Sequence, residues 1–234
     1  MPEEFFLSFL KKEQIAKDTY AFYFSREKSD FDFIAGQYIR ITLPVEPSHL
    51  FSIASSPLEK GYIRIITRIT GSPFKNALLT LTPNSEVKIF GPIGRFTLQD
   101  EEKEYVFLAG GIGITPFVSI IEYAAAKNLT VPITLFTSFS TVEETIFHKE
   151  FLEIAKAHPN IKIIHTITQL ESAVLWNGEK GRISPELIKK YVSDPLLPLY
   201  YIAGPPKMVE AMERIVKAMS VSNDKIKKEN FIGY

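Results

Sequence analysis

The segment "VFLAGGIGITPFVSII", residues 106–121, places an apolar run directly before a glycine-rich loop, a Thr-Pro pair and a second apolar run. An apolar run that ends in glycines and continues into a helical pattern predicts a buried strand, a tight turn and a helix. A glycine loop that leads into a helix N-terminus presents backbone N–H groups and the positive end of the helix dipole. Such a turn can bind a phosphate group.

The side chains of this loop fit that interpretation. Gly110, Gly111 and Gly113 allow close approach to the backbone, Thr115 can cap the helix, and Pro116 fits its first turn. The loop lacks the full G-x-G-x-x-G pattern of dinucleotide sites. Two interpretations therefore stay open, a pyrophosphate site and a glycine turn that only closes the corner between strand and helix.

The chain from about residue 104 onwards repeats this strand-then-helix pattern. Its pairs are "YVFLAG" with "TPFVSIIEYAAAKN", "ITLFTS" with "VEETIFHKEFLEIAKAH", "IKIIHTIT" with "SPELIKKYV", and "LYYIAG" with "PPKMVEAMERIVKAM". Four such alternations predict a doubly wound parallel sheet with helices on both faces. "YIAGPPKM", residues 201–208, predicts a second glycine turn at the same carboxyl edge of the sheet.

The first hundred residues show a different sequence pattern. Short aromatic and β-branched segments alternate with Gly, Pro, Ser and Asp breaks, as in "TYAFYFS", "YIRIITRIT" and "EVKIFGPIG". This pattern predicts an antiparallel β domain. Within it, "SPFKNALLTL" predicts a helix capped by Ser72 and beginning at Pro73.

Composition excludes several classes of function. The chain of 234 residues has 27 basic and 27 acidic residues, so its net charge is zero and does not favour binding to nucleic acid. It has no cysteine, which excludes disulfides, thiolate zinc sites and a cysteine-ligated iron–sulfur cluster on this chain. The histidines lack metal-ligand spacing, so no metal site is expected. The acidic N-terminus and the absence of a long apolar run favour a cytoplasmic protein without membrane insertion.

Eight segments together resemble the ferredoxin-NADP reductase family over nearly the whole chain. In order they are "GQYIRI", "HLFSIAS", "TGSPFKNAL", "GPIGRF", "AGGIGITP", "GEKGRI", "AGPPKM" and the tail "FIGY". The resemblance implies a flavin-binding Greek-key β-barrel over residues 1–99 and an NAD(P)-binding α/β domain over 104–234, with the two cofactor rings meeting in a cleft. The iron–sulfur domain that some relatives carry is not expected.

The resemblance also implies the flavin site. In the family's Arg-x-Tyr-Ser segment, the arginine binds phosphate, the ring lies on the isoalloxazine and the serine faces flavin N5. Ser52 is thus the expected catalytic residue. The flavin-binding residues implied by position are His49, Phe51, Ser52, Ile66, Thr67, Arg68, Gly71, Lys75 and Asn76. The alternative for "HLFSIAS" is an edge strand whose Phe and Ile face the core.

Three departures bear on this flavin site. Phe51 keeps a stacking surface where the family has tyrosine, but His49 lacks the guanidinium fork of the family's arginine. Arg40 or Arg68 could supply the missing cation. Lys75 stands where the family usually has serine and could offset the loss at His49.

The dinucleotide site follows from the same resemblance. Its expected residues are Gly111, Gly113, Thr115, Pro116, Ser138, Gly204, Pro205 and Pro206. Ala203 replaces the cysteine that orients nicotinamide in the family. Near Ser138 no arginine or lysine is available for a 2′-phosphate, and this favours NADH over NADPH. Phe231 or Tyr234 is expected to cover the flavin until nicotinamide displaces it, and the alternative is a frayed tail.

These features favour an NAD(P)H-dependent flavoprotein reductase with FAD, or FMN as the alternative. Hydride would pass from nicotinamide C4 to flavin N5 and the electrons onward to ferredoxin, another redox protein or a small-molecule acceptor. Two alternatives remain open: a reductase that uses free flavin as a substrate, and an electron-transfer subunit of a larger complex. The sequence leaves the oligomeric state undetermined.

Overall fold

The computed structural model describes residues 2–27, 29–44, 46–99, 102–171 and 174–232. The chain forms two compact units. The barrel unit comprises Met1–Leu98 and Thr115–Lys127, and the sheet unit comprises Gln99–Ile114 and Asn128–Tyr234. The chain therefore passes between the units three times, and the helix after the glycine loop belongs to the barrel unit.

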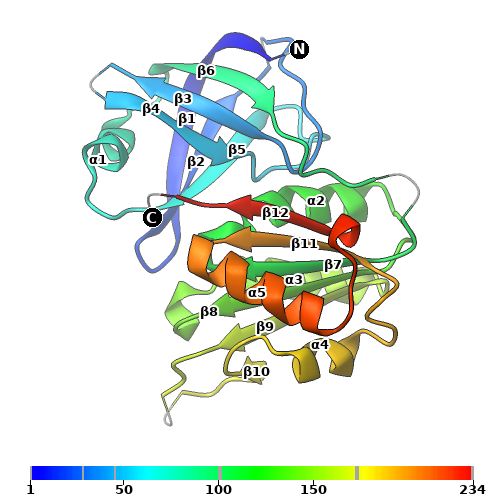
Figure 1. The fold of residues 1–234 in the computed structure, drawn as a ribbon. Coiled ribbons are helices and arrows are strands. Elements are labelled where there is room, and N and C mark those ends of the chain that lie inside the picture. Colours follow the sequence, from blue (N-terminus) through cyan, green and yellow to red (C-terminus); the bar gives the residue numbers. More distant parts are fainter. Residues whose placement is uncertain (1, 28, 45, 100–101, 172–173, 233–234) are drawn as a thin grey trace. The chain divides into compact units, whose positions relative to one another are not determined.

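The barrel unit contains one antiparallel sheet and two helices (Figure 1). Its elements are β1 (Glu3–Ala16), β2 (Thr19–Ser25), β3 (Tyr38–Leu43), β4 (Glu46–Ser52), β5 (Tyr62–Arg68), α1 (Pro73–Thr80), β6 (Glu86–Ile93) and α2 (Thr115–Ala126). The strand order is β4-β3-β6-β1-β2-β5. An isolated antiparallel bridge pairs Ile53 with Ile65, so the two ends of this order meet and the sheet closes.

Long strand β1 makes this closure possible. Its first half pairs with β6, and its second half pairs with β2, with register shifts after Phe9 and Gln14. Aromatic and β-branched side chains from alternating positions fill the interior, and they include Phe9, Phe22, Phe24 and Ile65. This core is the physical reason that the aromatic-rich first hundred residues form a barrel.

The predicted helix near residue 72 is confirmed. Pro73 is the first residue of α1, and the Ser72 hydroxyl accepts a hydrogen bond from the Lys75 amide at 3.4 Å. Proline lacks an N–H that would in any case be unsatisfied in the first turn. The expected start and cap of the helix therefore agree with the structure.

The sheet unit contains an entirely parallel sheet with strand order β10-β9-β8-β7-β11-β12. Its elements are β7 (Tyr105–Gly110), η1 (Gly111–Ile114), β8 (Ile133–Phe139), η2 (Val142–Glu144), α3 (His148–Ala157), β9 (Ile161–Ile167), β10 (Glu179–Lys180), α4 (Pro185–Tyr191), β11 (Leu199–Gly204), α5 (Pro206–Ala218), η3 (Asn223–Lys225) and β12 (Ile226–Asn230).

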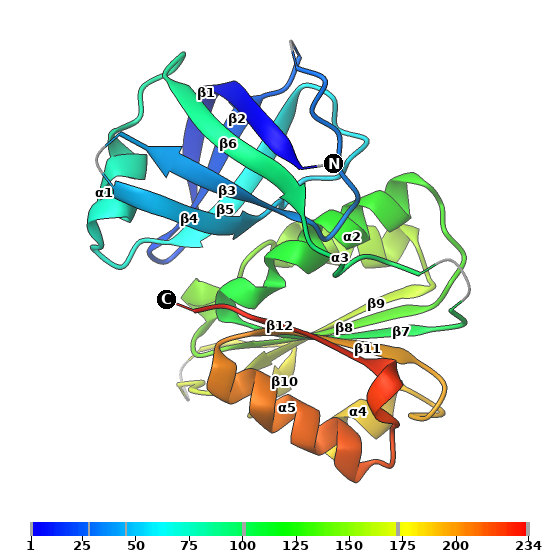
Figure 2. The ribbon, with the colours of Figure 1, turned by 45° about the horizontal axis from the view of Figure 1, so that its top comes forward.

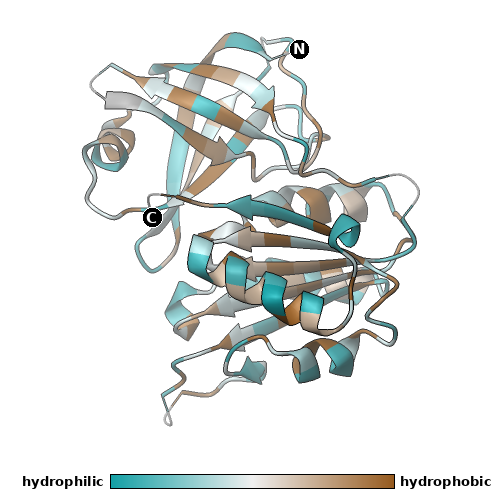
Figure 3. Ribbon diagram, viewed as in Figure 1, coloured by the Kyte–Doolittle hydropathy of each residue, from teal (hydrophilic) through white to brown (hydrophobic). Residues whose placement is uncertain are grey.

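Helices cover both faces of this parallel sheet, as predicted. Figure 2 shows α3 on one face and α4 with α5 on the other. In Figure 3 the inner strands β7, β8 and β11 are largely hydrophobic, whereas edge strand β12 and much of α5 are hydrophilic. The buried strands thus carry the near-continuous apolar runs that a doubly covered parallel sheet requires.

The structure differs from the sequence-based expectation at the glycine loop. The loop forms the 3₁₀ turn η1, and Thr115 is the first residue of α2 rather than its cap. Three strands also escaped prediction: the whole of β1, two-residue β10 and edge strand β12. Within the described part of the chain, no helix has the length and apolar character needed to cross a membrane.

Candidate functional site

Strand β4 places the first set of predicted flavin residues at one end of the barrel. The rings of His49 and Phe51 both pack against Phe74 in α1, with ring centroids 4.3 Å and 5.9 Å apart. His49 is exposed, whereas Phe51 is 4% exposed and belongs to the barrel core. The structure therefore places both positions beside the first turn of α1, and Phe51 and Ile53 face the barrel core, as the alternative interpretation of this segment expects.

The first turn of α1 has open space next to its backbone. Gly71 has a φ of +77°, which favours glycine, and a Cβ placed there would have no neighbour within 4 Å. The Asn76 side-chain amide donates to the Gly71 carbonyl at 3.2 Å and holds the entry of the helix. This turn can present its amides to an anion, as expected for residues 71–76.

Two cations lie near this turn. Lys75 is 2% exposed, and burial lowers its pKa to about 8, with the charge of Arg68 adding to the shift. Like charges held close together in a buried setting are typical of a site that receives an anion. Arg68 is therefore the better candidate for the missing cation, because the Arg40 guanidinium lies 4.8 Å from the centre of the Phe90 ring.

The remaining flavin candidates belong to adjacent strands. Ile66 and Thr67 of β5 are buried, and the Thr67 hydroxyl faces the Arg68 carbonyl at 3.4 Å. Ser52 ends β4 opposite Tyr38 of β3 and is 7% exposed. Ser52 therefore lies where the strand ends and a loop begins.

The candidate dinucleotide site lies where the strand order of the sheet unit reverses. Chain order runs outward from β7 to β10 on one side and continues with β11 and β12 on the other. At the carboxyl ends, Gly110 pairs with Ser138 and Gly204 pairs with Asn230. The Met208 side chain packs against both Gly110 and Gly204, and the reversal is the position where doubly wound sheets bind nucleotides.

The glycines of this edge have different roles. A Cβ at Gly113 would overlap the backbone of Ala203 and Gly204, so this glycine allows η1 to pack on the end of β11. A Cβ at Gly111 would meet nothing within 4 Å, and its φ is +50°. The open backbone suited to a phosphate is therefore at Gly111, while Gly113 is needed for packing within the protein.

The other predicted dinucleotide residues are at helix starts. Pro206 is the first residue of α5, and Pro205 precedes it at the N-cap position. Thr115 and Pro116 begin α2 and are buried. Both helices thus start directly after a glycine turn, as the sequence predicted.

The C-terminal segment continues from β12. The Phe231 amide donates to the Gly204 carbonyl at 2.9 Å, so the chain is held as far as this residue. Tyr234, the other predicted flavin cover, lies outside the described residues. The interpretation of the whole tail as frayed is therefore wrong for Phe231.

Glu229 is a candidate that sequence reasoning missed. It lies on β12 opposite Ala203, the position where the family has cysteine. Its Oε2 atom is buried without a hydrogen-bond partner among the described residues, and burial raises its pKa to about 7. Only the strand register shows this proximity, because the two positions lie on different strands that are far apart in the chain.

Comparison with known families agrees with this geometry. Residues 7–98 match the model of the oxidoreductase FAD-binding domain, and residues 107–214 match that of the oxidoreductase NAD-binding domain. Together the two matches span most of both units. The chain belongs to the oxidoreductases that combine an FAD-binding with an NAD-binding domain.

Solved structures of this family share the fold over nearly the entire chain. The cytochrome P450 reductase GcoB of Amycolatopsis aligns with a TM-score of 0.88 at 23% identity, covering 98% of this chain and 70% of that one. A ferredoxin NADP⁺ reductase of Neisseria gonorrhoeae with bound FAD and NADP aligns with a TM-score of 0.82 at 20% identity, covering 97% and 98%.

Curated relatives in sequence are longer proteins. One subunit of the Na⁺-translocating NADH-quinone reductase of Klebsiella pneumoniae is 28% identical over 197 residues, which are 78% of this chain and 48% of that protein. The corresponding subunit of Methylococcus capsulatus is 27% identical over 198 residues, which are 78% and 49%. The chain thus spans about half the length of these relatives.

Proposed function

We propose that this protein is an NADH-dependent flavoprotein reductase that passes electrons to a separate acceptor. When bound, the nicotinamide and the flavin supply the chemistry, a hydride transferred from nicotinamide C4 to flavin N5. The observation that carries the proposal is the glycine edge at the strand-order reversal of the sheet unit, combined with the buried Lys75 of α1 and the half-buried Arg68 of β5 in the barrel unit.

On the flavin side, each residue has a defined task. Lys75, Arg68 and the first-turn amides of α1 bind phosphate. The Ser52 hydroxyl would hydrogen-bond the reacting edge of the ring system, and Phe51, which packs against Phe74 in the barrel core, would support the site from within the barrel. No protein base is required, since the transferred hydride carries its own electron pair.

On the dinucleotide side, the Gly111 backbone and the starts of α2 and α5 bind the pyrophosphate, and Ser138 contacts the adenosine half. Gly204 leaves room for the nicotinamide end beside Ala203, with Pro205 and Pro206 shaping the turn. Phe231 covers the flavin in the resting protein, with Tyr234 as the alternative.

Residues after β8 support NADH as the dinucleotide. The stretch from Ser138 to His148 has no lysine or arginine for a 2′-phosphate, and it contains Glu143 and Glu144 in the first turn of η2. Carboxylates disfavour a doubly charged phosphate nearby. The names of the curated relatives also specify NADH.

The acceptor is a redox protein or a small molecule. The curated relatives are subunits of a quinone reductase, whereas the structural relatives include a cytochrome P450 reductase and a ferredoxin reductase. In its most specific form, the proposal names ferredoxin as the electron acceptor and the cytoplasm as the location of the protein.

The absorbance spectrum of the purified, desalted chain tests the proposal. We expect a yellow protein whose flavin absorbance bleaches on anaerobic addition of NADH. The absorbance of the oxidised flavin should return when an electron acceptor is added. A yellow protein whose flavin is never bleached by NADH would refute the reductase activity and favour the alternative of a docking subunit.

A free-flavin reductase is a second candidate, favoured by the exposed His49 in place of arginine. The imidazole of His49 lacks the planar fork by which guanidinium binds phosphate with two hydrogen bonds, so the flavin would be held loosely. A colourless desalted protein that oxidises NADH only when flavin is added would select this candidate. The same preparation therefore distinguishes the two functions.

A further inference from the structure

The four residues that follow Ser52 are held by an unusually complete set of polar contacts. Arg64 of β5 is the centre of this set and is 7% exposed. Its guanidinium donates to the Ala54 carbonyl from Nε at 3.0 Å and from Nη2 at 2.6 Å. Its backbone carbonyl accepts from the Ala54 amide at 2.7 Å, and its amide donates to the Ser55 hydroxyl at 3.1 Å.

Helix α2 completes the set from the other side of the segment. The Ser119 hydroxyl, which is fully buried, donates to the Ser55 carbonyl at 2.7 Å. Glu122 accepts from the Ser56 amide at 3.2 Å through Oε2, and from Arg64 Nη2 at 2.5 Å through Oε1. Each oxygen of the carboxylate therefore faces one fixed donor. All of these residues belong to the barrel unit.

Stability alone is a poor explanation for this ion pair. The side chains of Arg64 and Glu122 are only 9% and 31% exposed, and a pair this far removed from water gains little over apolar residues of the same size. Charge-assisted hydrogen bonds do fix direction, because both partners must keep one geometry. The pair is therefore best explained by the geometry that it imposes on residues 53–56.

We propose that Glu122 is a positioning residue for Ser52, acting through Arg64 and the backbone of Ala54–Ser56. The inference rests on the proposed function, in which the Ser52 hydroxyl contacts the reacting edge of the flavin. Ile53 adds a further constraint, because its amide donates to the Gln37 carbonyl at 2.9 Å. With the following backbone held, the backbone at the end of β4 keeps its place, and so does the Cβ from which the Ser52 hydroxyl projects.

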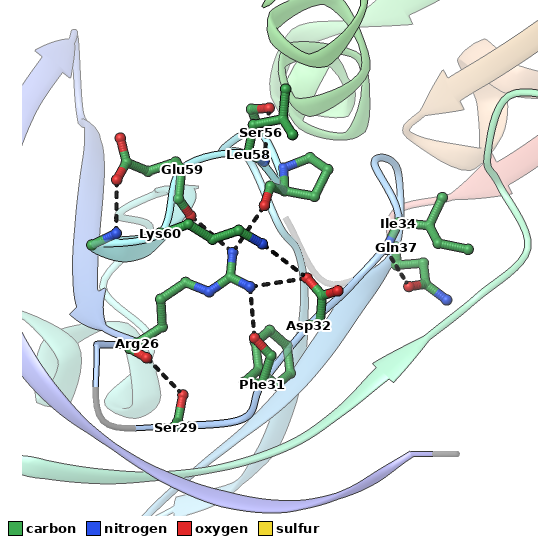
Figure 4. A network of polar contacts seen from close by, with 12 residues as sticks. Arg26, Ser29, Phe31, Asp32, Ile34, Gln37, Ser56, Leu58, Glu59 and Lys60 are labelled. Atoms are coloured by element: carbon green, nitrogen blue, oxygen red, sulfur yellow. Dashed lines mark hydrogen bonds and ion pairs between the residues drawn. The ribbon is translucent and has the colours of Figure 1, made fainter. Parts of the chain in front are cut away.

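A second arginine network offers a matched control in the same unit. Arg26 donates to Asp32 at 3.0 Å, to the Phe31 carbonyl at 2.6 Å and to the Glu59 carbonyl at 2.8 Å (Figure 4). It is also a nearly buried arginine paired with a carboxylate, since Arg26 is 5% exposed. The Asp32 side chain is 73% exposed, and the hydrogen bonds of Arg26 to the following loop go to Pro57 and Glu59, so Asp32→Asn breaks an arginine–carboxylate pair that does not contact residues 53–56 directly.

Amide hydrogen exchange tests the structural half of the proposal without any NADH. Glu122→Gln keeps the size of the side chain but replaces one acceptor oxygen by a donor. We expect exchange at the Ala54 and Ser56 amides to accelerate about tenfold or more. The strand amides of Phe22 and Ile65 should be unchanged, and Asp32→Asn should leave Ala54 and Ser56 protected. Unchanged exchange in Glu122→Gln would overturn the proposal.

A double-mutant cycle tests the functional half. Single-turnover bleaching of the flavin by saturating NADH should slow about tenfold in Glu122→Gln, with flavin still bound. Ser52→Ala/Glu122→Gln should be no slower than Ser52→Ala alone, because Glu122 acts only through Ser52. If Glu122→Gln slows bleaching by the same factor in Ser52→Ala as in the wild type, the positioning role would be overturned. A general loosening of the barrel would give that result, because it would slow both proteins equally.

A second variant guards against misfolding. Ser119→Ala removes one hydrogen bond to the Ser55 carbonyl and should give a smaller change of the same kind in both measurements. If NADH does not bleach the flavin of the wild-type protein, the proposed function fails and hydrogen exchange alone decides the positioning claim. Failure of the two proposals is therefore distinguishable.

Discussion

Lys75 is the residue of the candidate flavin site whose charge should depend most on pH. Burial and Arg68 lower its pKa to about 8, so the ligand-free protein loses this cation as the pH rises through that value. We expect flavin affinity to fall above this pH, because the phosphate loses a charged partner. Lys75→Gln should weaken flavin binding about tenfold to a hundredfold and remove this pH dependence.

The control for this prediction is a lysine of β1 that contacts the other end of the same helix. Lys12 donates to the carbonyls of Leu79 and Leu81, so Lys12→Gln changes a contact of α1 without touching its first turn. Fluorescence titration of the desalted protein with FAD measures both variants. Equal affinities for Lys75→Gln and the wild type would exclude Lys75 from the site.

His165 predicts acid sensitivity of the sheet unit. It is 4% exposed, its Nδ1 lies 2.7 Å from the Thr137 hydroxyl, and its ring centre is 4.8 Å from that of His148. Burial lowers its pKa to about 3, and His148 adds to the shift. In the unfolded chain His165 binds a proton below about pH 6.5, whereas in the folded chain it stays neutral until about pH 3. The free energy of unfolding therefore falls as the pH falls through this range.

Chemical denaturation across this pH range measures the effect. His165→Gln does not titrate, so its free energy of unfolding should fall less steeply than that of the wild type between pH 6.5 and about pH 3. His158→Gln, at the C-cap of α3, serves as the control and should follow the wild type. Parallel profiles for the wild type and His165→Gln would contradict the assignment.

At the scale of elements, the sequence predicted those whose own residues determine them. Alternating apolar positions, Ser72 with Pro73, and the glycine turns each act locally, and the corresponding strands and helices are present. Strand β12, "IKKEN", reads as polar and lies at the edge of its sheet, where one side needs no apolar neighbour. Its pairing with β11 depends on a distant strand, so local pattern could not reveal it.

The glycine turn gives a prediction at this scale, because its glycines differ in surroundings. Gly113→Ala should lower the free energy of unfolding by more than about 2 kcal/mol, since the new Cβ would overlap the end of β11. Gly111→Ala should cost only about 1 kcal/mol, for its left-handed backbone, and should weaken NADH binding instead. Thermal unfolding and NADH titration separate the two effects.

The opposite pattern would reverse the two roles. A stable Gly113→Ala with weakened NADH binding would place the phosphate at Gly113, as the sequence alone first suggests. A Gly111→Ala variant that binds NADH normally would remove Gly111 from the site.

At the scale of the whole molecule, the resemblance in sequence predicted the family and both cofactor-binding domains, which the family comparisons confirm. The individual site residues stay predictions. What sequence could not provide are contacts between distant segments: the stacking of Phe51 on Phe74, the burial of Lys75, and the Arg64–Glu122 pair. All three depend on elements that are far apart in the chain, so the local sequence around each residue does not reveal them.

The central claim is that one chain binds flavin and reduces it with NADH. Anaerobic stopped-flow mixing of the flavin-loaded protein with NADH, in parallel with NADPH, tests this most directly. Complete bleaching of the bound flavin in one phase, faster with NADH than with NADPH and slowed when C4 of NADH carries deuterium, is the predicted result. Bound flavin that stays oxidised at saturating concentrations of both dinucleotides would contradict the account.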